Sequence, residues 1–304
     1  MSSVRDKQGK FRPLWAFTLS IILSALAFFI SNNIAHEAGD GRPFRIEFIF
    51  RCLWSLLVFG IFVWMLTVGD HIEEQRVAAL GLPRVRGWIG QFVLGCVVGA
   101  VLTSLAVVPI HVWGHFRFIP LMSLHLLPNL GALLLMLLIG ALAEELVFRG
   151  YPLQHLERAI GAVPAVLVLS VFYGALHLMN PHADLWAVGN SILIGIVLSI
   201  AYLRTRALWL PWGIHFGWNA ALGFGFGLPV SGYRVFTLWL YTDAYGPKWL
   251  TGGNYGVEAA ATGALAFAIG ILLLWKLPVR ALPQPERHTP PEPALRDAVS
   301  SIQN

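Results

Sequence analysis

The chain has 304 residues, of which 57% are hydrophobic and only 12% are charged. Soluble domains carry about 25% charged residues, so this composition excludes an ordinary soluble protein and indicates a polytopic membrane protein. The net charge of +5 gives no support to a nucleic-acid partner, because basic residues in such a chain mostly orient it in the bilayer.

Eight apolar stretches approach the length of about 17–25 residues that a bilayer-spanning helix needs. They are residues 14–30, 48–68, 88–110, 127–148, 163–178, 185–202, 208–222 and 259–277. The first is longer than the apolar core of a signal peptide and more spans follow it, so we expect an anchor. The predicted fold is therefore an all-α, polytopic transmembrane helix bundle of about eight spans.

The basic residues predict how this bundle is oriented. All but six of the 21 Lys and Arg residues fall in the N-terminus, the C-terminal segment and alternate loops. The six on the other side are Arg42, Arg45, Arg51, Arg117, Arg234 and Lys248. This asymmetry predicts a multi-pass protein of the plasma (inner) membrane with both termini in the cytoplasm. The two cysteines, Cys52 and Cys96, lie in or beside apolar runs and predict neither a disulfide framework nor a thiolate metal site.

Three of the apolar stretches carry polar residues that are costly at membrane depth. They read Glu144-Glu145-Leu-Val-Phe-Arg149, Tyr173-Gly-Ala-Leu-His177 and His215-Phe-Gly-Trp-Asn219. One alternative is that the glutamates only mark the end of a span and that the histidines only bond helices together. The occurrence of all three groups within residues 144–219 favours a functional site.

Helix geometry assigns different tasks to the two glutamates. Residues four apart share a helix face, so Glu145 and Arg149 are predicted to pair, which leaves Glu144 for another task. A hairpin that turns near Gly161 would bring Glu144 level with His177. Two prolines in that segment, Pro152 and Pro164, leave open whether the hairpin is continuous.

These three motifs resemble those of the CPBP family of intramembrane proteases. The family includes the type II CAAX prenyl endopeptidases and the bacteriocin-processing or self-immunity (Abi) proteins, and its pattern is EExxxR, FxxxH and HxxxN. The first and third motifs match fully, whereas the second has Tyr173 in place of Phe. The resemblance covers about residues 125–225. It divides the chain into N-terminal transmembrane helices (1–124), a catalytic core (125–225), a loop with the last transmembrane helix (226–280) and a disordered cytoplasmic tail (281–304).

The resemblance implies hydrolysis of a peptide bond within the membrane. Glu144 would act as general base on a water held with His177, and His215 and Asn219 would stabilise the oxyanion. Glu145, Arg149 and Tyr173 would support this site, and Tyr173→Phe, which restores the usual family residue, would be nearly silent.

The same resemblance leaves cofactor, substrate and activity open. A cofactor-free mechanism is favoured, but Glu144, His177 and His215 also form a plausible zinc set. The expected partners are the lipid bilayer and a peptide or membrane-protein substrate, with or without a lipid modification. A non-enzymatic immunity or scaffold protein and a transporter with Glu144 as proton site remain as alternatives.

Overall fold

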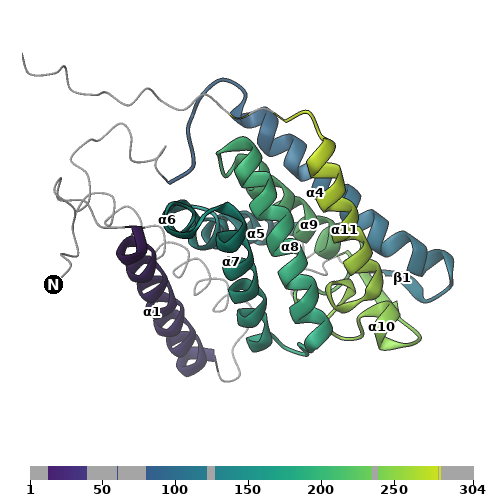
Figure 1. The fold of residues 1–304 in the computed structure, drawn as a ribbon. Helices are drawn as coiled ribbons and strands as arrows, with labels where there is room; N and C mark the ends of the chain where they lie inside the picture. The colour runs from purple at the N-terminus through teal and green to yellow at the C-terminus, as the bar shows by residue number, and fades with distance from the viewer. Residues whose placement is uncertain are drawn as a thin grey trace, which may run out of the picture.

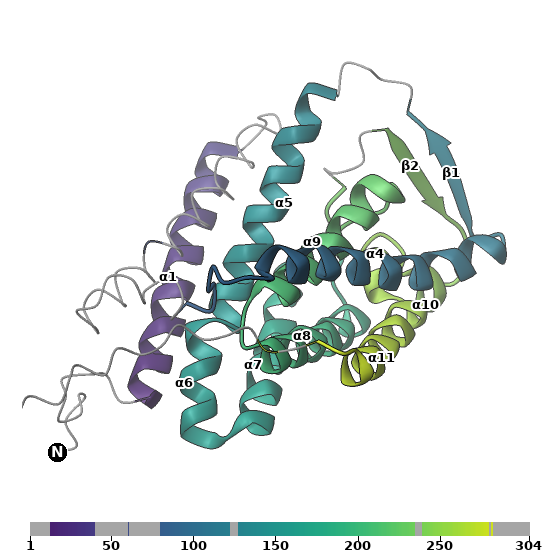
Figure 2. The same ribbon diagram turned by 90° about the horizontal axis from the view of Figure 1, so that it is seen from above.

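The computed structural model describes residues 13–39, 80–121, 127–234 and 239–279, together with residues 60 and 281. Most of this part of the chain is helical (Figures 1 and 2). The longer helices are α1 (Pro13–Gly39), α4 (Trp88–Val112), α5 (Leu127–Phe148), α6 (Tyr151–Ile160), α7 (Ala162–Leu176), α8 (Leu185–Thr205), α9 (Trp209–Ala220) and α11 (Ala261–Lys276). Short helical turns cover His177–Met179, Ala221–Gly225, α10 (Lys248–Thr251) and Val257–Ala259.

Four stretches of the described residues are long and apolar enough to cross a membrane. They are Trp88–Val112, Leu130–Ile160, Ala162–Met179 and Leu185–Thr205. The chain is therefore a membrane protein, while the number of eight spans stays a prediction. The predicted second span, 48–68, apart from residue 60, and the predicted disordered tail, apart from residue 281, lie outside the described residues.

Helix α9 is not among the four stretches long enough to cross a membrane, although the π-helical turn Ala221–Gly225 extends it. Its 12 residues rise about 18 Å, against a hydrocarbon core of about 30 Å. Most of its side chains are buried, because α4, α5 and α8 pack around it. The segment predicted as a span at 208–222 therefore lies in the core of the bundle, and its crossing of the membrane stays a prediction.

The helices form a bundle in which α7, α8 and α11 lie in a row, each in contact with the next (Figure 1). Helix α4 packs against both α9 and α11, and α1 lies at the edge of the bundle against α5 and α6. The outer face of α4 is an exposed apolar stripe that suits contact with lipid, formed by Ile89, Val93, Val97, Val101, Leu105 and Val108.

The hairpin predicted near Gly161 is present. Gly161, with φ +88°, separates α6 from α7, and the two helices contact each other. Pro152 and Pro164 lie in the first turns of α6 and α7, where the missing backbone N–H has no helical partner to lose. The first arm of the hairpin is thus divided at Arg149–Gly150, between α5 and α6, and Pro152 begins its second part, whereas Pro164 lies in the first turn of an unbroken α7.

A small antiparallel sheet departs from the prediction of an all-α chain. Strand β1 (Phe116–Pro120) follows α4 and pairs with β2 (Leu240–Ala244), so that Phe116 lies opposite Ala244 (Figure 2). The segment Phe-Arg-Phe-Ile-Pro has the aromatic and β-branched residues of a strand, but its partner lies far along the chain. Such distant pairing leaves no local signal in the sequence.

Candidate active site

A buried ion pair lies at the end of α5. Arg149 Nη1 donates to Glu145 Oε1 at 3.1 Å, and the two side chains are 1% and 0% exposed. This is the pair predicted from the four-residue spacing. Arg149 also donates to the carbonyl of Gly195 on α8 at 3.3 Å, and its guanidinium lies 4.6 Å from the ring centre of Tyr173 on α7. The pair therefore joins α5 to α7 and α8.

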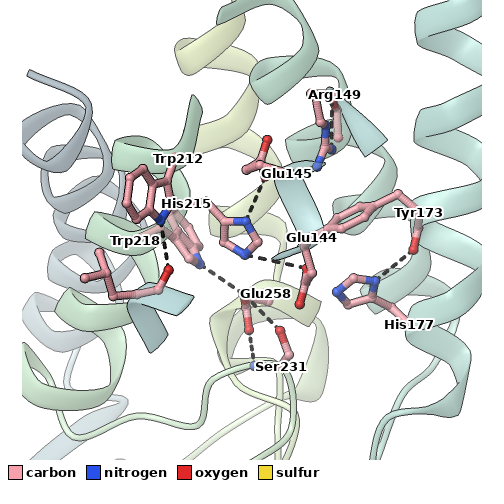
Figure 3. A network of polar contacts seen from close by, with 12 residues as sticks. Glu144, Glu145, Arg149, Tyr173, His177, Trp212, His215, Trp218, Ser231 and Glu258 are labelled. Atoms are coloured by element: carbon pink, nitrogen blue, oxygen red, sulfur yellow. Dashed lines mark hydrogen bonds and ion pairs between the residues drawn. The ribbon is translucent and has the colours of Figure 1, made fainter. Parts of the chain in front are cut away.

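Glu145 also orients the histidine on α9. His215 Nδ1 lies 2.9 Å from Glu145 Oε1, and since a carboxylate can only accept, Nδ1 carries the hydrogen. This fixes the ring so that Nε2 faces Glu144, 3.7 Å from its Oε2 (Figure 3). The imidazole is thus held between the two adjacent glutamates.

Glu144 is the accessible member of the glutamate pair. Its side chain is 31% exposed, whereas that of Glu145 is fully buried. The hydroxyl of Tyr173 donates to Glu144 Oε2 at 3.1 Å, a contact that the sequence analysis did not predict. The carboxylate of Glu144 is therefore held in place by α7 and still open to a water or a substrate.

His177 lies where α7 ends, on the same side as Glu144. Its Nδ1 lies 2.8 Å from the carbonyl of Tyr173, which can only accept, so the hydrogen is on Nδ1 and Nε2 is left as an acceptor. Figure 3 shows the half-buried ring beside the carboxylate of Glu144. The hairpin thus brings Glu144 and His177 level, as predicted.

Asn219 follows His215 by one turn of α9 and is half-buried. Among the described residues, its amide makes no hydrogen bond to Glu144, His177 or His215. Helix α9 ends one residue later, at Ala220, and continues into the π-helical turn Ala221–Gly225. Position and exposure leave the amide able to donate to a ligand.

Comparison with family models identifies this part of the chain. Residues 125–221 match the model described as type II CAAX prenyl endopeptidase Rce1-like. This segment is an Rce1-like domain. It contains all three motifs, and it confirms the family that they indicated. Proteins of this family are membrane proteases. Comparisons with curated proteins and with solved structures gave no match.

Glu144, His177 and His215 are the three residues that would hold a zinc ion in the alternative considered above. Among the residues that the structure describes, no group of three His, Cys, Asp or Glu side chains is placed to hold a metal ion. Each histidine donates from Nδ1, His215 to Glu145 and His177 to the Tyr173 carbonyl, which leaves Nε2 as the atom that a metal would bind. These donor types suit zinc, but the three side chains are not grouped around a common point in the described part of the chain, so we derive no step through a metal.

The sequence analysis missed how α9 is positioned next to the Rce1-like motifs. Gly95 and Gly99 on α4 face Gly213 and Gly217 on α9, and a Cβ on any of them would lie within 2.4 Å of a backbone oxygen of the other helix. Two Gly-xxx-Gly motifs thus let the backbones of α4 and α9 touch. The spacing of these glycines is a readable signal that predicts a close helix pair.

A third glutamate near the site, Glu258, was not predicted by any motif or spacing in the sequence. Glu258, in the turn before α11, accepts hydrogen bonds from Trp218 of α9 and from Ser231 (Figure 3). It lies 37 residues beyond the end of the match at residue 221, in a segment that resembles no motif. Only the folded structure brings it to α9.

Proposed function

We propose that this protein is an intramembrane endopeptidase that uses Glu144 to activate water. The observation that carries the proposal is the placement of one accessible carboxylate, held by Tyr173, between His215 Nε2 at 3.7 Å and the ring of His177. A general base needs this combination of fixed geometry and access to water. The match of residues 125–221 to a protease family supports the same chemistry.

In the proposed reaction, Glu144 takes a proton from a water whose other hydrogen is accepted by Nε2 of His177. The resulting hydroxide attacks the carbonyl carbon of the scissile peptide bond. In its protonated form, His215 donates from Nδ1 to Glu145 and from Nε2 to the oxyanion, and the amide of Asn219 supplies a second donor. Glu144 then gives its proton to the leaving nitrogen as the C–N bond breaks, which restores the carboxylate.

The proposed substrate is a peptide or membrane-associated protein, cleaved as in CAAX processing or in removal of a leader segment. The predicted cytoplasmic location of Arg149 places Glu144 in the cytoplasmic half of the bilayer, so we expect the substrate to enter from that side. Glu145 and Arg149 take no proton in this scheme. They support the site by fixing the ring of His215.

A comparison of membrane proteomes tests the proposal. A deletion strain is complemented with the wild type, with Glu144→Ala or with Glu157→Gln, all at matched protein levels. Glu157 is the control, because it pairs with Arg206 away from the site and partly exposed pairs contribute little to stability. We expect one or more uncleaved proteins to accumulate in the deletion and Glu144→Ala strains only.

The result also separates the enzyme from its alternatives. Full cleavage in the Glu144→Ala strain would refute the proposed role of Glu144. A deletion phenotype that Glu144→Ala rescues, with no uncleaved protein in any strain, would favour an immunity or scaffold protein.

A further inference from the structure

Glu258 is a carboxylate at the candidate site that neither the three motifs nor the family match includes. Its Oε1 accepts from Trp218 Nε1 at 3.0 Å and from Ser231 Oγ at 3.5 Å, and its Oε2 accepts from the backbone N–H of Ser231. It thus connects α9 to the turn around Ser231, which has a left-handed φ of +48°.

The partners of Glu258 are all neutral. In the part of the chain that the structure describes, no Lys or Arg forms an ion pair with it. Placing a carboxylate in a largely apolar bundle without a cation is costly, so packing alone does not account for a glutamate here. Its hydrogen bonds to Trp218 and Ser231 are the interactions that offset this cost.

Trp218 lies between the two residues that are proposed to bind the oxyanion. It follows His215 by three positions and directly precedes Asn219. Its indole is 2% exposed and packs against Phe267 of α11, with ring centres 4.6 Å apart. A fixed indole therefore fixes the rotation of α9 about its axis at the turn that carries His215 and Asn219.

We infer that Glu258 is a positioning residue, which holds Trp218 and thereby sets where His215 and Asn219 point. Two carboxylates then hold α9, Glu145 at His215 and Glu258 at Trp218. The inference rests on the proposed endopeptidase function for its catalytic consequence, but the contact itself can be tested without activity. It also extends the functional unit from residue 221 to residue 258.

The kinetic test uses a substrate found by the proteome comparison and compares Glu258→Ala, Glu258→Gln and Trp218→Phe. Trp218→Phe removes the indole donor but keeps Glu258. If Glu258→Ala fails to fold, Trp218→Phe still tests the hydrogen bond between the two residues. The control is Asp184→Asn, because Asp184 also joins two segments, through Lys248 at 2.9 Å, but shares no hydrogen bond or ion pair with Glu258, Trp218 or His215 among the described residues. Folded protein is quantified by size-exclusion chromatography.

Because oxyanion donors act in the transition state, we expect kcat to fall about 10- to 100-fold in Glu258→Ala with KM nearly unchanged. Glu258→Gln keeps an acceptor for one donor and should recover part of this loss. The double variant Glu258→Ala/Trp218→Phe should be no slower than Glu258→Ala alone, because both changes remove the same contact. Asp184→Asn should match the wild type.

A second readout needs no substrate. In isotope-labelled protein, the imidazole signals that disappear in His215→Ala identify His215, and we expect them to shift in Glu258→Ala and Trp218→Phe but not in Asp184→Asn. Unchanged His215 signals together with unchanged kcat would overturn the inference. Where the wild type cleaves nothing, the proposed function has failed, and the His215 signals alone decide whether Glu258 positions α9.

Discussion

Replacing Gly217 with alanine tests whether the close contact between α4 and α9 sets the geometry of the site. The added Cβ would lie 2.4 Å from the carbonyl oxygen of Cys96 and 2.7 Å from its Cα. Both atoms belong to the backbone of α4, so no side chain can rotate away. A methyl carbon ordinarily needs about 3.5 Å, so the two helices must separate by about 1 Å.

This displacement acts directly on the candidate site, because His215 precedes Gly217 by two positions on α9. A misplacement of about 1 Å can cost about 100-fold in rate, and overpacking costs about 1–3 kcal/mol of stability. We therefore expect Gly217→Ala to reduce kcat by about 100-fold while much of the protein still folds and inserts.

The assay measures substrate cleavage and thermal stability in detergent at matched amounts of folded protein. Gly90→Ala is the control, because Gly90 lies on α4 with nothing within 4 Å of its added Cβ. It should behave like the wild type. If Gly217→Ala kept the wild-type kcat, the glycine contact would not set the position of His215, and the reasoning would be refuted.

Glu145→Gln leaves Arg149 buried without its carboxylate, and because breaking a buried pair costs about 3–5 kcal/mol, we expect thermal stability and activity to fall together. Wild-type stability in detergent would contradict this. Tyr173→Phe removes only the hydroxyl that donates to Glu144, and we expect about a 10-fold lower kcat from the loss of a bond to a charged acceptor. An unchanged kcat would instead support the expectation from the family pattern that Tyr173→Phe has almost no effect. Purified protein should contain less than one zinc per chain and stay active after chelation, whereas activity restored only by added zinc would favour the metalloprotease. A reporter that works only outside the cytoplasm should be inactive when fused after residue 290, and an active fusion would refute the cytoplasmic C-terminus.

The sequence predicted those features that depend on spacing within one segment. The pair of Glu145 with Arg149 follows from their separation by four residues, and the hairpin at Gly161 follows from the need to bring Glu144 level with His177. The family match then confirmed the family that the motifs indicated, over residues 125–221, which contain all three motifs. Local helix geometry was sufficient for each of these predictions.

Features that depend on distant segments could not be predicted in this way. The hydrogen bond of Trp218 to Glu258 spans 40 positions of the sequence, and β1 pairs with a strand more than 100 residues away. No periodicity or motif links such partners. Tyr173 was missed for a different reason. The sequence analysis named it as a supporting residue but gave no reason for its hydroxyl to donate to Glu144.

The spacing of the buried ion pair also bears on how this protein enters the membrane. The later partners of the pair, Gly195 and His215, lie 46 and 70 positions further along the chain, so α5 is synthesised well before they exist. Because Arg149 lies four residues after Glu145, directly beyond the last residue of α5, each charge can be neutralised by its neighbour during insertion. The helix therefore carries its own counter-ion into the bilayer, and it exchanges no partner when the rest of the bundle assembles around it.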